Sequence, residues 1–570
     1  MLFLDIAACS CIAYVIWTIF RLQHNYVKAK KIGLPIIFSP VNVFGPLWLT
    51  TKGFLGSTLE KLPFGLGEWV ARTEVGWTYH HKFQIHAEHG EAFIIVSPAE
   101  NEIVLAEPNA AEEVMRRRND FIKNPAVYGM LDVFGPNLDT VNGKVWDRHR
   151  KITVPPFNEK NSALVWRESG NQAEQLLQTW CEKVEVRSTQ PDIFAVALNV
   201  LCEAGFGVHS KFVDEPNFSR SEESDQHLGY RECLRLLLSN FIQLVILNAV
   251  QKSALPTKWL LWGRMKKIAI ARDQFLGYMT NLLAIEQRAF DQGDMDRHNL
   301  MSALVRAQGQ SQESDSVRKN TPNTASGGLS DGEVYGNLFI YSLAGHDTTA
   351  GALHFAIVLL AVNPELQDWV GEEIDAVRNA DPSGLCFYEE TFPKLVRCLA
   401  LMYETARLHG PVVMMPRYVD SSPQRLQIHG REHIIPPHTT RTLNFVALHT
   451  HPEHWGPDPL SFRPSRWIVP DENAESGGTC FLEPTPGSYV PWNSGPRVCP
   501  GRKFSQVEFV RVVYGLFAGG TRVQLVREPG ESLSDARDRA LRIVNEAKVE
   551  VTLKMVDAYR IGLKWVKGQS

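Results

Sequence analysis

The chain opens with an apolar run from Leu2 to Phe20, broken only by Asp5 and a few small polar residues. As a helix, this run would be roughly 28 Å long, close to the thickness of a bilayer's hydrocarbon core. Arg21 and three lysines follow it, and positive charge after a span marks the cytoplasmic side. We therefore expect residues 1–21 to form a single transmembrane anchor. The alternative is an apolar helix that packs on the globular body.

Prolines and hydrophobic periodicity divide the rest of the chain. Residues 22–60 are basic and contain several prolines, which predicts a stiff linker. In residues 61–570, strand-like runs such as Ala92 to Val96 alternate with longer helical patterns, and helices dominate by length. Residues 308–328 are polar and nearly free of large apolar side chains. They cannot offset their ordering entropy by burial, so we expect a mobile surface loop.

A capping pattern directly after this loop predicts a long core helix. Ser330 and Glu333 have the spacing of a capping box, and an apolar run continues as far as Val362. Asn363 and Pro364 would stop this helix and begin the next one. A helix that is apolar on most sides belongs in the protein core.

Composition excludes several classes of function. The chain is 44% hydrophobic and 21% charged with a formal net charge of -4, so a nucleic-acid partner is not expected. Its nine cysteines show no C-x-x-C spacing, which fits a reducing compartment better than a disulfide scaffold. Neither the cysteines nor the 18 histidines form a cluster suited to structural zinc.

The strongest local motif is WNSGPRVCPG at residues 492–501, which a helical pattern follows. A thiolate such as that of Cys499 is a strong axial ligand for a haem iron. Gly495 would permit a tight turn, Gly501 a close approach to a flat ring, and Arg497 a pairing with an acidic group. For a lone cysteine, a buried structural thiol before an ordinary helix would be the better interpretation.

This motif resembles the haem-binding loop of cytochromes P450, F-x-x-G-x-R-x-C-x-G, at Gly495, Arg497, Cys499 and Gly501. Trp492 stands where the family usually has phenylalanine, so the position stays aromatic. The resemblance implies that Cys499 ligates the iron of haem b and that the other four residues contact the haem.

A second motif, AGHDTT at residues 344–349, lies in the middle of the long predicted helix. Glycine and adjacent threonines are poor helix formers, and such a penalty in a core helix indicates function. By resemblance, Ala344 and Gly345 leave room for dioxygen near the haem, while Asp347 and Thr348 deliver protons to it. The alternative is that Thr348 bonds back to its own helix and Asp347 caps a surface polar group.

Glu404 and Arg407, three residues apart, would alone be an ordinary surface ion pair. Together with Arg466 they resemble the family's E-x-x-R pair and the later arginine that joins it. The resemblance implies a buried structural set that holds the cysteine loop. Removing Glu404 would then cost about 3 to 5 kcal/mol and lose the haem.

Trp146, His149 and Arg150 resemble the family's W-x-x-x-R helix. Trp146 and Arg150 are one helical turn apart and can share a face. The resemblance implies that both approach the haem propionates and that His149 adds a donor. Without the other motifs, a partly buried tryptophan beside a solvated face would explain the pattern.

The resemblance implies the cytochrome P450 fold, mostly α-helical with small β-sheets, behind the N-terminal transmembrane helix. The implied activity is that of a haem-thiolate monooxygenase acting with dioxygen. A haem-thiolate isomerase or dehydratase that needs no external electrons is the alternative within enzymes, and Asp347 and Thr348 disfavour it because such chemistry needs no proton relay. A haem gas sensor or carrier is the non-enzymatic alternative.

Electrons must come from another protein, because the sequence contains neither a P-loop nor a glycine-rich dinucleotide fingerprint. The resemblance implies an NADPH–cytochrome P450 reductase in the same membrane, that of the endoplasmic reticulum, with the catalytic domain facing the cytosol. Basic residues could receive the acidic surface of this reductase, or could form an ordinary solvated face. They are Arg148, Lys151, Arg502 and Lys503.

A lipophilic substrate is expected, because the family lines its pocket with apolar side chains and the anchor places the enzyme beside lipid. By analogy with fungal members, a secondary-metabolite intermediate is the expected class. The expected pocket residues are Phe134, Leu343, Val412, Val413, Met414 and Met415.

Overall fold

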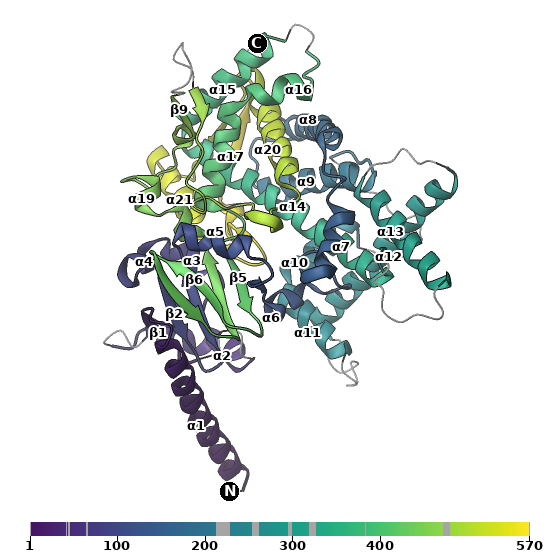
Figure 1. The fold of residues 1–570 in the computed structure, drawn as a ribbon. Helices are drawn as coiled ribbons and strands as arrows, with labels where there is room; N and C mark the ends of the chain where they lie inside the picture. Colours follow the sequence, from purple (N-terminus) through teal and green to yellow (C-terminus); the bar gives the residue numbers. More distant parts are fainter. Residues whose placement is uncertain are drawn as a thin grey trace. The chain divides into compact units, whose positions relative to one another are not determined.

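The computed structural model describes residues 2–41, 43, 46–63, 67–212, 228–252, 262–293, 299–317, 327–381, 384–470 and 479–568. The chain forms two compact units (Figure 1). Unit 1 comprises Met1–Val127, Val412–Ser461 and Glu483–Cys499, and unit 2 comprises Tyr128–Pro411, Phe462–Leu482 and Pro500–Ser570.

Unit 1 is built on a six-stranded sheet with the order β1-β2-β3-β8-β5-β4. Apolar side chains from the sheet and from the amphipathic helix α5 (Pro108–Arg116) form its core. The strand-like run Ala92 to Val96 forms β2, as predicted. The other strands are β1 (Ile36–Phe38), β3 (Asn101–Leu105), β4 (Ile122–Lys123), β5 (Met414–Val419) and β8 (Thr439–Asn444), and a separate hairpin joins β6 (Gln424–Ile428) to β7 (Arg431–Ile435).

The N-terminal helix α1 (Leu2–Lys30) runs past the expected end of the anchor without a break. Its second half docks on unit 1: Arg21 donates to the carbonyls of Pro98 and Ala99, and Asn25 donates to that of Ser97. The expected linker 22–60 is therefore largely structured, because it also contains β1 and α2 (Pro46–Leu59). Prolines interrupt helices here but do not prevent the chain from packing.

The first half of α1 extends away from the sheet of unit 1 (Figure 1). Its described apolar side chains are exposed, for example Ile16 at 62% and Phe20 at 64%. Side chains of the expected anchor before Ile12, other than Cys9, lie outside the described residues. Among the described residues, one helix is long and apolar enough to cross a membrane, and it is the core helix α14, whose tested stretch is 89% buried.

Unit 2 is mostly helical, and α14 (Asp331–Val362) packs against α9, α17 and α20. These and the other long helices are α7 (Gly143–Thr153), α8 (Glu159–Cys181), α9 (Thr189–Phe206), α10 (Tyr230–Ser239), α11 (Phe241–Lys252), α12 (Gly263–Asp291), α13 (Leu300–Val317), α15 (Pro364–Asn379), α17 (Val396–His409), α20 (Arg502–Phe517) and α21 (Leu533–Asn545). Three two-stranded sheets complete the described part of this unit: β9 (Ile468–Pro470) with β10 (Thr479–Phe481), β11 (Arg522–Leu525) with β14 (Leu563–Val566), and β12 (Lys548–Val549) with β13 (Leu553–Lys554).

The predicted bounds of α14 are confirmed. Ser330 and Glu333 form the capping box, and Pro364 stands in the first turn of α15. The expected loop 308–328 is only partly a loop, since α13 continues to Val317. Glutamine and glutamate in residues 308–317 are good helix formers, which explains the longer helix. Residues 318–326 lie outside the described residues.

Candidate active site

The cysteine loop of unit 1 has a shape that depends on one glycine. The N–H of Cys499 donates to the carbonyl of Trp492 over 2.8 Å and closes the loop. Gly495 has φ 66°, a left-handed conformation that glycine adopts without steric cost. A Cβ there would lie 3.2 Å from Cα of Arg116 in α5. The tight turn predicted at Gly495 is confirmed, and Cys499 is exposed at the end of the loop.

A row of basic side chains crosses three strands of the unit 1 sheet. Lys123 in β4 is the register partner of Arg417 in β5, which in turn is the partner of Arg441 in β8. These three side chains and Arg497 of the cysteine loop are buried. Burial, together with the charges of Arg497 and Arg417, holds the pKa of Lys123 well below its usual range, while Cys499 acts in the opposite direction. Like charges opposite each other destabilise a sheet, so this row fits an anionic ligand.

Sequence reasoning missed Lys123, Arg417 and Arg441. Their proximity arises from the pairing of strands that lie far apart in the chain. The available signal is a single basic residue inside an otherwise apolar strand, as at Arg417 in β5. Burying a charged residue is costly, so a basic residue in a buried strand indicates a function.

In unit 2, α7 presents the paired residues of its motif as predicted. The guanidinium of Arg150 lies 5.3 Å from the centre of the Trp146 ring, within the range of a cation–π contact. Trp146 is buried. The helix thus offers an indole N–H and a guanidinium from one face.

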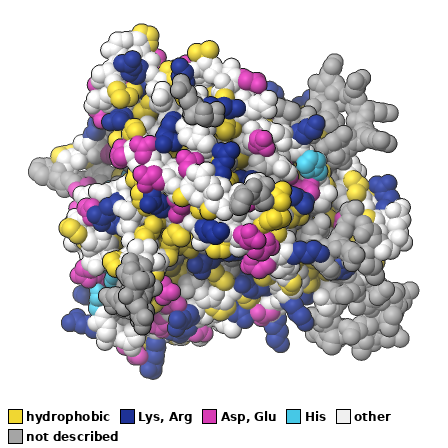
Figure 2. Space-filling view, turned by 90° about the horizontal axis from the view of Figure 1, so that it is seen from above, with side chains coloured by type: hydrophobic (Ala, Val, Ile, Leu, Met, Phe, Trp, Pro, Cys, Tyr) yellow, Lys and Arg dark blue, Asp and Glu magenta, His cyan; other side chains and the backbone are white. Residues whose placement is uncertain are grey.

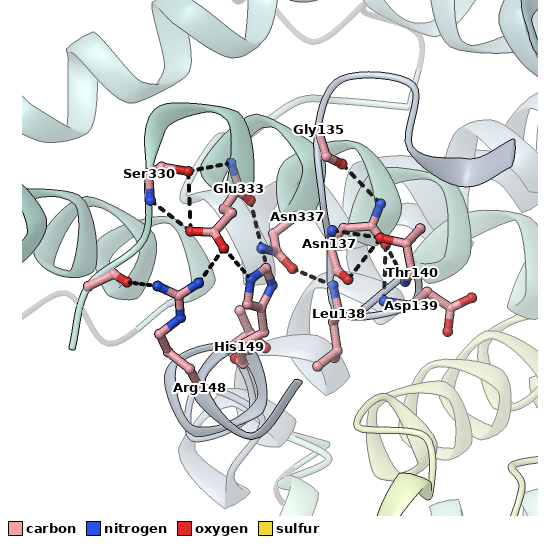
Figure 3. Close-up of polar contacts among 12 residues, drawn as sticks. Gly135, Asn137, Leu138, Asp139, Thr140, Arg148, His149, Ser330, Glu333 and Asn337 are labelled. Carbon is pink, nitrogen blue, oxygen red and sulfur yellow. Dashed lines mark hydrogen bonds and ion pairs between the residues drawn. The ribbon is translucent and has the colours of Figure 1, made fainter. Parts of the chain in front are cut away.

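His149 has a different role from the one predicted. Its buried ring places Nε2 3.1 Å from Oε1 of Glu333 and Nδ1 3.0 Å from Nδ2 of Asn337 (Figure 3). The N–H of Leu138 donates to Oδ1 of Asn337 over 3.0 Å, which leaves the amide nitrogen facing the ring. Nδ1 therefore accepts and Nε2 carries the proton. With both nitrogens used, His149 joins α7 to α14 and is not free to act as the expected haem donor.

Glu333 is the centre of this network (Figure 3). Its carboxylate accepts from the N–H of Ser330 over 2.9 Å and forms an ion pair with Arg148 in addition to the contact with His149. Partial burial raises the pKa of Glu333, but the hydrogen bonds from His149 and Ser330 and the charge of Arg148 lower it to about 2. The carboxylate therefore stays ionised and ties the start of α14 to α7.

The middle of α14 contains the second motif. The hydroxyl of Thr348 donates to the carbonyl of Ala344 over 2.9 Å, which is the back-bonding alternative raised by the sequence. Ala344 is exposed. A Cβ at Gly345 would come within 3.0 Å of the Leu201 side chain of α9. This glycine therefore permits close helix packing, a need that the resemblance did not indicate.

Asp347 is fully buried and does not cap a surface group. Its Oδ1 lies 2.9 Å from Nζ of Lys554 in β13, and its Oδ2 accepts a hydrogen bond from the hydroxyl of Thr552. Both partners belong to the C-terminal β12–β13 hairpin region and could not be found from local sequence. Asp347 and Thr348 are neighbours in the chain, but in this structure their side chains bond to different groups.

A second buried carboxyl, that of Glu508 in α20, faces α14. Burial raises the pKa of Glu508 well above its usual value, and the hydroxyl of Thr349 acts against that rise. Burial therefore favours the neutral form of Glu508. Sequence reasoning missed this residue, although a glutamate directly between Val507 and Phe509 is an indication of a buried acid.

The structure brings the residues of the E-x-x-R motif together with Arg466 in a buried set of contacts. Glu404 is fully buried and accepts hydrogen bonds from Arg407 Nε over 2.8 Å and from Arg466 Nε over 2.9 Å. The backbone N–H of Arg463 and the indole N–H of Trp467 also donate to it, over 2.8 and 3.0 Å. One carboxylate thus fixes α17 to the segment that carries Arg466.

The expected substrate residues fall into different environments within their units. The ring centres of Phe134 and Phe339 in α14 lie 5.1 Å apart, and Leu343 is buried in the same helix. Val412 is exposed, Val413 is buried and Met414 is half-buried. Met415 belongs to the hydrophobic core of unit 1, so it stabilises the sheet and is not available as a pocket residue. Alternation along β5 explains this correction, because Met415 points to the core face.

Comparisons with known proteins agree with these motifs. The family model described as Cytochrome P450 matches residues 57–513. A cytochrome P450 monooxygenase of Arthrobotrys oligospora is 28% identical over 98% of this chain and 97% of its own length. Cytochrome P450 monooxygenase 124 of Postia placenta is 30% identical over 84% of this chain and 86% of its own length. The phomenoic acid biosynthesis cluster cytochrome P450 monooxygenase of Leptosphaeria maculans is 29% identical over 92% of each chain.

Solved structures show the same fold. A cytochrome P450, CYP102L1, has a TM-score of 0.61 at 17% identity, with 85% of this chain and 96% of that chain covered. Retinoic acid-bound cyanobacterial CYP120A1 has a TM-score of 0.61 at 18% identity, with 85% and 93% covered. With the family model spanning most of the sequence, this chain belongs to the cytochrome P450 family and is a monooxygenase whose cofactor is haem b with a cysteine-ligated iron.

Proposed function

We propose that Cys499 is the cysteine that ligates the haem iron. Its exposed position at the end of a closed loop, directly before α20, supports this assignment. The buried cations of unit 1 add the observation that carries the proposal. The charges of Arg497 and Arg417 both act on Lys123, and Cys499 acts on Lys123 in the opposite direction. This places a thiol close to a group of basic side chains, a combination that suits a ligand with a metal ion and acidic groups.

The basic residues near Cys499 fit haem b, because its two propionate groups are acidic. The propionates carry negative charge, and Arg417, Lys123 and Arg497 would hold them from unit 1. Considered by itself, unit 2 carries the family's other proposed propionate contacts, Trp146 and Arg150 of α7. Gly501 and Ala344 offer no bulky side chain to a flat ring, whereas the position of a Gly345 side chain faces Leu201 of α9.

Bound haem supplies the activation of dioxygen with electrons from a redox partner. In our proposal the protein contributes the protons. Thr348 would leave the carbonyl of Ala344 and donate its hydroxyl proton towards the activated oxygen, and Asp347 would restore that proton. Asp347 and Thr348 are adjacent in the chain, and the transfer requires their side chains to come within hydrogen-bonding distance.

We propose an NADPH–cytochrome P450 reductase as the source of the electrons. Of the basic residues expected to receive it, Arg148 is already paired with Glu333, and Nζ of Lys503 lies 4.3 Å from the centre of the Phe392 ring. Lys151 and Arg502 are exposed and are the better candidates. On the face seen in Figure 2, basic and acidic side chains are interspersed.

The exposed apolar half of α1 supports a membrane anchor, with the catalytic units on the cytosolic side of the endoplasmic reticulum. A lipophilic substrate from secondary metabolism fits this location, and one relative is named for a phomenoic acid biosynthesis cluster. Phe134 and Leu343 are the pocket residues that unit 2 supports.

The test is expression with a reductase in microsomes. We expect NADPH-dependent conversion of lipophilic metabolites to products that gain one oxygen atom. Conversion of a substrate without NADPH would favour an isomerase or dehydratase, and reversible gas binding without turnover would favour a sensor or carrier. Arg502→Glu and Lys151→Glu should weaken reductase binding in a salt-dependent way, whereas Lys52→Glu in unit 1 serves as the charge-matched control.

A further inference from the structure

The buried carboxylate of Asp347 is joined to the protein surface by a single basic side chain. Nζ of Lys554 lies 2.9 Å from Oδ1 of Asp347 and 3.9 Å from Oε2 of Glu550. The exposed fractions of these side chains rise outward, from 1% for Asp347 to 13% for Lys554 and 48% for Glu550. Lys554 thus lies between a buried acid and an exposed one.

The hairpin that carries Lys554 is fixed to the body of unit 2. The N–H of Leu553 donates to the carbonyl of Pro411 over 3.0 Å, and the hydroxyl of Thr552 donates to Asp347. The ammonium of Lys554 also lies 5.1 Å from the centre of the Phe194 ring. These contacts restrict the motion of the ammonium and favour its ion pair with Asp347 over other partners.

Among the described groups that face Asp347, Lys554 carries the positive charge that pairs with the carboxylate. His346 is the neighbouring titratable group, but its Nδ1 bonds to the carbonyl of Ser342 over 2.6 Å, and burial lowers the pKa of His346 so that the ring is neutral. Thr552 is uncharged. A carboxylate buried to this extent stays ionised only with a paired cation, so its charge depends on Lys554.

We propose that Lys554 is a positioning residue for proton delivery: its ion pair with Asp347 keeps this carboxylate ionised and links it through Glu550 to solvent. In each turnover Asp347 takes one proton from the ammonium and passes one to Thr348, and the amine takes up a proton from a hydronium ion on the Glu550 side. Lys554 and Asp347 then hold the same protons as before, and one proton has moved from solvent to Thr348. This inference rests on the proposed role of Asp347 in supplying protons.

The matched variants are Lys554→Met, Lys554→Arg and Lys548→Met. Lys548 is the register partner of Lys554 in the same hairpin and is exposed, so its loss tests for a general effect of charge removal there. Asp347→Asn tests the acid itself. All variants are to be studied as full-length, haem-loaded protein, with the reduced carbon monoxide difference spectrum as the check that the cofactor is bound.

The first measurement is the urea midpoint at neutral pH. Lys554→Met leaves a buried carboxylate without its cation and should lower the midpoint, and Asp347→Asn in the same chain should restore most of the loss. Lys554→Arg and Lys548→Met should stay near the parent value. A Lys554→Met loss that Asp347→Asn does not relieve would show that the two groups are not coupled.

The second measurement is the share of NADPH that ends as hydrogen peroxide, with reductase and oxygen, from pH 6 to 9. When proton delivery is impaired, more of the NADPH is spent on reducing oxygen to hydrogen peroxide. The peroxide share therefore reports on proton delivery, and it can be measured without an identified substrate. Lys554→Met should raise the peroxide share several-fold at every pH, because Asp347 loses the side chain that passes protons to it. Glu550→Gln should raise it less.

The outcomes separate this inference from the proposed function. If Asp347→Asn raises the peroxide share while Lys554→Met behaves like Lys548→Met, Asp347 acts without Lys554 and the inference is overturned. If Asp347→Asn itself changes nothing, the proposed proton role of Asp347 fails, and the role of Lys554 fails with it. The cysteine ligand and the haem assignment would be unaffected.

Discussion

Arg466 donates from Nε to Oε1 of Glu404 over 2.9 Å, in a site from which solvent is almost completely excluded. Arg407 donates to the same carboxylate, which is 0% exposed. A buried ion pair of this kind adds little net stability, but removing one partner leaves the other charge unpaired.

Glu404→Ala should therefore destabilise the protein by about 3 to 5 kcal/mol and prevent stable haem incorporation. The measurement is the yield of reduced carbon monoxide absorbance per milligram of purified protein. Glu372→Ala is the matched control, because Glu372 pairs with Arg397 on the surface at 69% side-chain exposure and should cost at most about 1 kcal/mol. Normal absorbance in Glu404→Ala would contradict the structural role of the carboxylate.

Gly495→Ala should distort the cysteine loop for two reasons that can be separated. The residue has a positive φ of 66°, and the added methyl would press on the backbone of α5 at 3.2 Å. Gly430→Ala carries the first penalty without the second, since its φ is 71° and nothing lies within 4 Å. We expect weakened haem retention in Gly495→Ala alone, measured as loss of Soret absorbance during dialysis. Equal retention in the two variants would show that the contact with α5 is unimportant.

His86 should make stability depend on acid pH. Burial, partly opposed by the hydrogen bond to the carbonyl of Gly90 and the charge of Glu91, lowers the pKa of His86 from 6.5 to about 4. A lowered histidine pKa favours the neutral ring in the fold, so its contribution is complete above about pH 6.5 and is lost as the pH falls towards 4. The loss amounts to roughly 3 kcal/mol, which a urea midpoint between pH 7 and 4 would detect.

His86→Phe removes this titration while keeping an aromatic ring beside Phe93, whose centre lies 5.0 Å away. The midpoint of this variant should fall less steeply with acid than that of the parent protein. His24→Phe, at an exposed position of α1, is the control and should retain the parent slope. An unchanged slope in His86→Phe would assign the acid sensitivity to other groups.

Local sequence was sufficient where a motif and its structure lie in the same segment. The capping box of Ser330 and Glu333, the bounds of α20 and the turn at Gly495 all follow from residues a few positions apart. Propensity and backbone sterics act over this range, which is why these features could be predicted.

Features that depend on pairing between distant segments could not be predicted. Arg417 meets Lys123 and Arg441 only through the register of three strands, and Asp347 meets Lys554 only through the placement of a C-terminal hairpin. His149 illustrates the converse. Its motif suggested a ligand contact, but Asn337 and Glu333 of α14 use both ring nitrogens.

The central claim is that the sulfur of Cys499 is the axial ligand of the haem iron. The direct test replaces Cys499 with serine or histidine and records the reduced carbon monoxide difference spectrum, with Cys480→Ser as the control because Cys480 is also exposed. We predict that the thiolate-specific absorbance of the reduced carbon monoxide complex disappears only in the Cys499 variants. A Cys499→Ser protein that keeps that absorbance would contradict the assignment.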